Sequence, residues 1–154
     1  MTIPQWVLLG FAAWTLFILS GPVGLYRWAN ILTGQARVSQ WRADGVEGRG
    51  WYRRAVRAHM NCVENLPVYA AIVVCATAFQ ATGPLLDAAA LTLLAARLCQ
   101  TTTHITFEQT DRVVSVRFTF FFVQVVCMFI MGTSVAMSAA EGRAETTQAV
   151  YSNT

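Results

Sequence analysis

The sequence contains no lysine, few charged residues and no paired cysteine motif, and these absences narrow the class of protein. Only 12% of its 154 residues are charged, 55% are hydrophobic, and the mean hydropathy is +0.46. Soluble domains usually carry about 25% charged residues. The four cysteines, Cys62, Cys75, Cys99 and Cys127, show no CxxC spacing, which disfavours a disulfide framework and a zinc site. We predict a polytopic α-helical membrane protein whose cysteines are small packing residues.

Common catalytic and metal-binding motifs are missing as well. The sequence has no GxSxG and no Walker pattern. Its two histidines, His59 and His104, lack a set of neighbouring ligands, because Glu108 at i+4 from His104 makes a single pair. One pair is too few for zinc or iron. The arginines show no interleaved aromatic pattern of the kind that binds RNA, so we expect no metal and no nucleic acid.

Four long apolar stretches approach the ~20 residues that a helix needs to cross a ~30 Å hydrocarbon layer. We predict spans at about 4–32, 53–81, 84–107 and 112–139, which together form an all-α four-helix membrane domain over residues 1–140. Residues 1–5 carry no basic side chain, so the first stretch is a retained span and not a signal peptide. Gly21-Pro22 should kink this span. The polar tail over 141–154 is expected to be disordered.

The distribution of arginine predicts the orientation in the membrane. Cytoplasmic loops are enriched in positive charge. Seven of the eleven arginines lie between the first and second apolar stretches, near residues 5–26 and 66–81: Arg27, Arg37, Arg42, Arg49, Arg53, Arg54 and Arg57. We therefore place the first and third loops in the cytoplasm and both chain termini on the opposite side.

Polar side chains gather at the cytoplasmic ends of the predicted spans. Arg57, Asn61 and Glu64 follow i, i+4, i+7 spacing at the start of the second span, so they share one helix face. Ionisable groups inside a membrane are costly and each is a candidate functional residue. The ends of the third and fourth spans at this side add Arg97, Gln100, His104, Glu108, Arg112 and Arg117.

Arg97 is the most deeply placed of these residues, and two interpretations of it stay open. It could form a structural salt bridge with Glu64 between the second and third spans. Alternatively, the cluster binds an anionic, water-soluble ligand that enters from the cytoplasm. We favour the second interpretation, because three arginines against one deeply placed carboxylate leave an excess of positive charge that is expensive to bury.

Three segments of the sequence together form a recognisable pattern. They are Arg57-Ala-His-Met-Asn61-Cys-Val-Glu64-Asn-Leu-Pro67, Leu32-Thr33-Gly34-Gln35-Ala36-Arg37 and Ala96-Arg97. With them the chain resembles the MAPEG family, the membrane-associated proteins in eicosanoid and glutathione metabolism, over most of residues 5–138. The resemblance implies a four-helix protomer assembled as a homotrimer, with glutathione bound as co-substrate at the cytoplasmic side between subunits.

The resemblance also assigns expected roles. In enzymes of this family an arginine stabilises the glutathione thiolate, which attacks an apolar electrophile or reduces a peroxide. Here the arginine implied for that role is Arg112 first and Arg117 second. The implied glutathione-binding residues, to which we add His104 from the polar cluster, are Arg37, Arg57, Asn61, Glu64, Arg97 and His104.

The expected function is therefore a membrane-embedded glutathione transferase or peroxidase. Its partners would be copies of itself, membrane lipids and an apolar substrate that arrives from the bilayer. The sequence departs from the family pattern where tyrosines are usual, with Gln100, His104 and Phe118 in their place. The alternative is a non-enzymatic lipid-binding or scaffold protein of the same fold, because the family includes one such member, the lipoxygenase-activating protein.

Overall fold

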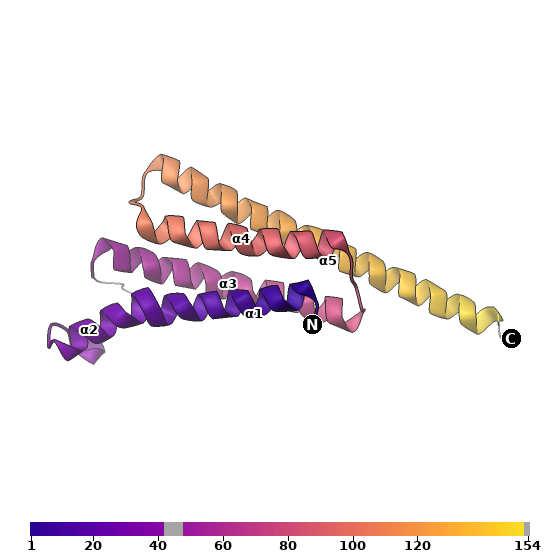
Figure 1. Ribbon diagram of the computed structural model, residues 1–154, viewed down its shortest axis with the longest axis horizontal. Coiled ribbons are helices and arrows are strands. Elements are labelled where there is room, and N and C mark those ends of the chain that lie inside the picture. The colour runs from indigo at the N-terminus through magenta and orange to yellow at the C-terminus, as the bar shows by residue number, and fades with distance from the viewer. Residues whose placement is uncertain (42–47, 153–154) are drawn as a thin grey trace.

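The structure is a computed structural model that describes residues 1–41 and 48–152, and these residues form helices without any strand. α1, α3 and α4 lie side by side, and α5 runs along α4 and then extends beyond the bundle (Figure 1). This is the all-α architecture that the sequence predicts. The elements in chain order are α1 (Ile3–Ile18), η1 (Leu19–Leu25), α2 (Tyr26–Leu32), η2 (Val38–Gln40), α3 (Gly50–Ala78), α4 (Pro84–Thr106) and α5 (Asp111–Ser152).

Three segments of the described chain are long and apolar enough to cross a membrane. They are Ile3–Leu32 with 30 residues, Gly50–Ala78 with 29 and Asp111–Ala144 with 34. α4 has 23 residues, which at about 1.5 Å each gives about 35 Å, enough for a bilayer core. Its apolar character is interrupted by Arg97, Gln100, Thr101 and His104, and all four side chains are buried. α4 therefore carries its polar groups toward the interior of the bundle, where lipid does not reach them.

The first membrane segment is interrupted at the predicted place. α1, η1 and α2 follow one another without a break, and Pro22 lies inside η1, which is π-helical. Proline has no N–H for the bond one turn back, and a π-helical turn is a common way to absorb that loss. Gly24 is needed here, because a Cβ at this position would lie 2.9 Å from the Leu19 carbonyl oxygen.

The core of the bundle is apolar and joins α1, α3, α4 and α5. Its buried side chains include Phe11, Tyr69, Leu93 and Met131. The hydroxyl of Tyr69 donates a hydrogen bond to the Pro4 carbonyl oxygen at 3.0 Å. This bond satisfies the one polar atom of a fully buried ring and ties α3 to the first turn of α1.

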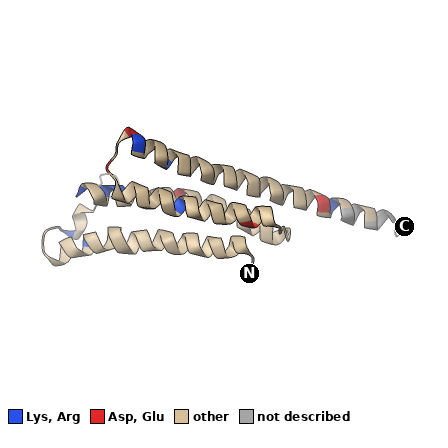
Figure 2. Cartoon of the chain, turned by 45° about the horizontal axis from the view of Figure 1, so that its top comes forward, with Lys and Arg blue, Asp and Glu red and all other residues tan. Residues whose placement is uncertain are grey.

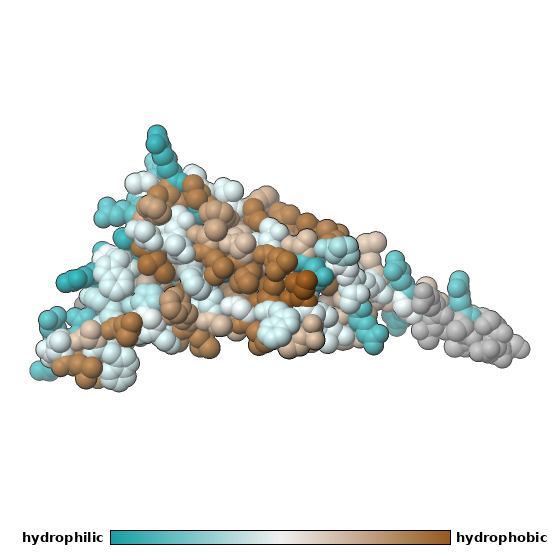
Figure 3. Space-filling view, viewed as in Figure 1, coloured by the Kyte–Doolittle hydropathy of each residue, from teal (hydrophilic) through white to brown (hydrophobic). Residues whose placement is uncertain are grey.

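We call one end of the bundle the arginine end, because α2 and α4 end there, α3 and α5 begin there, and most arginines lie there (Figure 2). An aromatic cluster packs at this end, with Tyr26 stacked on Tyr52 at 4.4 Å between ring centroids. Arg27 donates from Nε to the Tyr52 hydroxyl at 2.7 Å. Hydrophilic side chains gather here, whereas apolar side chains cover much of the middle of the face shown in Figure 3.

The prediction of a disordered tail from Glu141 is wrong for the described residues. α5 continues as one helix from Asp111 to Ser152. The tail contains Ala, Glu, Gln and Arg, which favour helix, and it extends a helix that already exists, so no nucleation cost arises. The polar end of α5 consequently projects beyond the bundle at the end opposite the arginine end (Figure 1).

Candidate functional site

Two pockets follow one another along the junction of α3 and α4 at the arginine end. The first pocket is lined by Arg57 of α3 and His104 of α4, and the second by Asn61 of α3 and Gln100 of α4. In each helix the two lining residues are four positions apart, which is about 6 Å along the helix axis. The two pockets are therefore neighbours, and we call the pair the trough.

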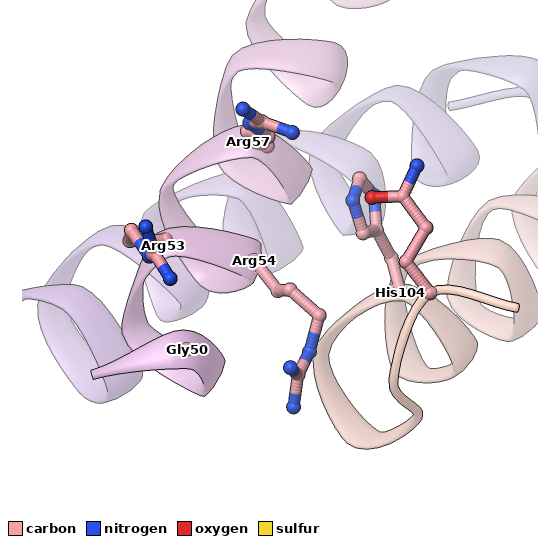
Figure 4. A pocket seen from close by; sticks show the side chains of 6 residues that line it. Gly50, Arg53, Arg54, Arg57 and His104 are labelled. Carbon is pink, nitrogen blue, oxygen red and sulfur yellow. The ribbon is translucent and has the colours of Figure 1, made fainter. Parts of the chain in front are cut away.

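The first pocket, which we call the arginine pocket, has a volume of about 260 Å³ and is lined by Gly50, Arg53, Arg54, Arg57, His104 and Gln109. The arginines project from the first two turns of α3, and His104 faces them from α4 (Figure 4). Arg54 donates from Nε to the Ile105 carbonyl oxygen at 3.1 Å, where the end of α4 leaves carbonyls without partners inside the helix. Among the described residues no carboxylate lines this pocket, so its lining presents positive charge to a ligand.

His104 is a candidate binding residue because its side chain is buried and lines the arginine pocket. Its side chain is only 5% exposed although it lines a pocket. The C-terminal turn of α4, where it lies, is held against α3 by the bond from Arg54. A ring that is fixed and mostly buried can present a nitrogen to a bound ligand at little cost in conformational entropy.

The second pocket, which we call the α3–α5 pocket, has a volume of about 300 Å³. Arg117 of α5 is half-buried, and its Nε is buried without a hydrogen-bond partner among the described residues. Glu64 supplies the only carboxylate among the described residues that line the trough. The pocket thus combines a guanidinium, a carboxylate, amides and an apolar rim. Its lining residues are Asn61, Glu64, Asn65, Gln100, Val114, Arg117, Phe118 and Phe121.

Arg97 lies behind the trough and lines neither pocket. Its side chain is 1% exposed, with the guanidinium 5.2 Å from the centroid of the Phe11 ring. Its Nη1 donates to Gln100 Oε1 at 2.9 Å, and Nε and Nη2 have no hydrogen-bond partner in the described chain. The salt bridge to Glu64 is therefore wrong as an interpretation: Arg97 points into the bundle, whereas Glu64 is exposed in the pocket.

Besides Arg97, two predicted site residues lie outside the trough. Arg37 is exposed at the start of η2, and Arg112 is exposed in the first turn of α5. Neither lines the arginine pocket or the α3–α5 pocket. Across the described residues, no group of three or more His, Cys, Asp and Glu side chains could hold a metal ion.

Sequence reasoning missed Gln124, which the structure shows behind the trough. This side chain is 1% exposed and donates from Nε2 to Gln100 Oε1 at 3.0 Å. A signal existed, because Gln124 is a single amide within the apolar run from Phe120 to Met131. A polar residue that faces lipid is costly, so a lone amide in a spanning helix indicates an inward-facing contact.

The sequence model of the MAPEG family matches residues 5–137. The chain belongs to the MAPEG family. No curated protein and no solved structure matches it. The matched range contains every residue that lines the trough. MAPEG membership implies a membrane protein with glutathione-related transferase or peroxidase activity, or an activity related to these.

Proposed function

We propose that this MAPEG protein is a membrane-embedded glutathione-dependent transferase or peroxidase, with glutathione in the trough. The observation that carries the proposal is the position of Arg117. Its half-buried guanidinium lies in one pocket with Asn61, Glu64 and an apolar rim. A cation beside a bound thiol favours the thiolate, which is the nucleophilic form.

The size of the trough fits a tripeptide that extends across both pockets. The pockets have volumes of about 260 Å³ and about 300 Å³, and each alone lies at or below the lower end of the usual ~300–1,000 Å³ range for ligand sites. Because they are one helical turn apart, an extended ligand can occupy both. The thiol, which belongs to the central residue of the tripeptide, would then lie in the α3–α5 pocket, and one charged terminus would lie in the arginine pocket.

The charges of the trough match those of glutathione. Glutathione has two carboxylates and one ammonium group besides its thiol. Glu64 is the partner for the ammonium, and Arg57, with Arg53 and Arg54 beside it, is the partner for a carboxylate. Asn61 and His104 add hydrogen-bonding groups between them. Arg117 remains for the sulfur, and it is a better candidate than Arg112, which is exposed outside both pockets.

The second substrate would be an apolar electrophile that arrives from the lipid. Phe118 is 65% exposed and Phe121 37% exposed, and both line the α3–α5 pocket beside Arg117. An apolar molecule dissolved in the bilayer can reach this rim without passing through water. Attack of the thiolate on such a molecule forms a thioether and releases a leaving group. Attack on a hydroperoxide forms an S–O bond, cleaves the O–O bond and releases an alcohol once the leaving oxygen is protonated.

Oligomeric state and orientation complete the proposal. We place the arginine end in the cytoplasm, following the positive-inside rule, so that the trough opens toward the cytoplasmic glutathione pool. In a homotrimer, a neighbouring copy would close the open side of the trough. Arg37, which is exposed at the same end, would then reach the glutathione of the neighbouring copy.

The non-enzymatic alternative is favoured by one observation. Gln100, His104 and Phe118 line the trough where the family resemblance suggests tyrosines. A phenol can donate a hydrogen bond to a thiolate, and the ring of Phe118 cannot. A protein that binds a lipid or glutathione without turnover would show affinity and no chemistry.

Titration of the detergent-solubilised protein with glutathione separates the two functions. The enzymatic proposal predicts a thiolate absorbance that saturates near neutral pH, together with conjugation of a simple aryl halide. S-methylglutathione is the matched control, because it keeps the charged groups but has no thiol, and it should bind without the absorbance. Glutathione binding with neither thiolate signal nor conjugation would support the alternative, and absence of glutathione binding would refute the enzymatic proposal.

A further inference from the structure

Gln100 makes hydrogen bonds at both ends of its amide. Its Oε1 accepts from Arg97 Nη1 at 2.9 Å and from Gln124 Nε2 at 3.0 Å. Its Nε2 donates to the Arg117 carbonyl oxygen at 3.4 Å. With two donors directed at the oxygen, the amide has one favourable orientation, and that orientation directs its own N–H groups toward α5.

These bonds hold α5 at two places. Arg117 and Gln124 are seven residues apart, or about two helical turns, and both bond to the same side chain of α4. A rotation of α5 by one residue would turn Arg117 by about 100° around the helix. The Arg117 guanidinium would then leave the pocket that it shares with Asn61 and Glu64.

Arg97 is the unusual member of this group. It is 1% exposed, and two of its three guanidinium nitrogens lack a hydrogen-bond partner in the described chain. Replacing even a buried ion pair by apolar side chains of similar volume is often neutral or stabilising, and a buried charge without an oppositely charged partner is more costly still. The stability of the bundle therefore gives no reason for a guanidinium here, whereas orientation of the Gln100 amide does.

We propose that Gln100, oriented by Arg97 and Gln124, is a positioning residue that fixes the rotation of α5 and thereby holds Arg117 at the trough. Its effect on the bound thiol rests on the proposed function. Its effect on the position of α5 does not, so the two can be measured separately.

The position of α5 is measured with spin labels and without any ligand. Nitroxides are attached at Met60 on α3 and Val116 on α5, which are 50% and 46% exposed. The exposed cysteines, Cys75 and Cys99, are first changed to serine. Labelled protein is diluted with unlabelled protein so that distances within one chain dominate. Gln100→Met should shift or broaden the distance distribution relative to the parent protein.

Thr101→Val is the matched control. Thr101 is buried in the same turn of α4, and its hydroxyl lies 3.7 Å from Cys62 Sγ on α3. The change removes a buried polar group of α4 without touching the bonds to α5. The distance distribution should therefore stay as in the parent protein. Arg97→Met, which leaves the Gln100 side chain in place, should give a smaller change than Gln100→Met in the same direction.

The bound thiol provides the second measurement. With glutathione, Gln100→Met should raise the pH midpoint of the thiolate absorbance and lower kcat on the order of 100-fold with little change in KM, because a misplacement of about 1 Å can cost that much. An unchanged distance distribution in Gln100→Met would overturn the positioning role whatever glutathione does. A shifted distribution with an unchanged pH midpoint would overturn it too. If the parent protein binds no glutathione, the proposed function fails, and the spin labels still decide the positioning role.

Discussion

Changing Arg117 to alanine should take away the positive charge that stabilises the bound thiolate. Arg117 is half-buried in the α3–α5 pocket, and its Nε has no hydrogen-bond partner among the described residues. It is the one arginine among the described residues that line that pocket. The substitution removes the cation and leaves Asn61, Glu64 and the arginine pocket in place, so glutathione should still bind.

The size of the effect follows from electrostatics. A unit charge at about 4 Å with an effective dielectric constant of about 20 interacts with a thiolate by about 4 kcal/mol. Because the trough is open to solvent, we expect the smaller shift of about 1 to 3 pH units that is typical for an acid beside arginine. A free cysteine thiol has a pKa of about 8.5. At pH 7 the ionised fraction of the bound thiol would then fall by about 10- to 30-fold in Arg117→Ala.

Thiolate absorbance of the complex as a function of pH measures this directly. Arg117 lowers the thiol pKa, so its removal should raise the midpoint: the signal at pH 7 is lost and returns in alkali. Arg117→Lys should retain part of the shift, since it keeps the charge. Arg112→Ala, at an exposed position outside both pockets, should leave the midpoint in place. A midpoint that moves in Arg112→Ala and stays fixed in Arg117→Ala would refute the assignment.

Three further predictions concern affinity, stability and assembly. Arg57→Ala should weaken glutathione binding by about 10-fold or more, since a hydrogen bond to a charged group contributes about 1.5–3 kcal/mol; calorimetry that finds equal affinity would exclude Arg57 from the site. Arg97→Met should leave the thermal midpoint unchanged or raise it, by the equivalent of about 1–4 kcal/mol. A large fall in that midpoint would mean that the buried guanidinium stabilises the bundle. Light scattering in detergent should give a protein mass of three times 17.0 kDa, and a monomer at all concentrations would contradict the trimer.

Helical periodicity was sufficient to place some of the site. Arg57, Asn61 and Glu64 were predicted on one face of a helix, and all three line the trough from α3. Periodicity could not show that Arg57 lines the arginine pocket while Asn61 and Glu64, further along α3, line the α3–α5 pocket. That division depends on where α5 covers the groove between α3 and α4, which is a property of packing.

The choice between Arg112 and Arg117 shows a second limit. The two residues are five positions apart, which on a helix is about 140° of rotation. The sequence predicts the helix but not which of its sides faces α3, because that depends on contacts such as those of Gln100 and Gln124. A pairing of Arg97 with Glu64 was plausible from charge alone and is wrong for the same reason: Arg97 is buried inside the bundle, whereas Glu64 is exposed in the α3–α5 pocket.

A crystal or cryo-electron microscopy structure with bound glutathione tests the central claim most directly. The account predicts that the tripeptide extends along the trough, with its sulfur beside the guanidinium of Arg117 and a carboxylate beside Arg57. Density for glutathione outside the trough, or a sulfur that faces Arg112 while Arg117 points away, would contradict it.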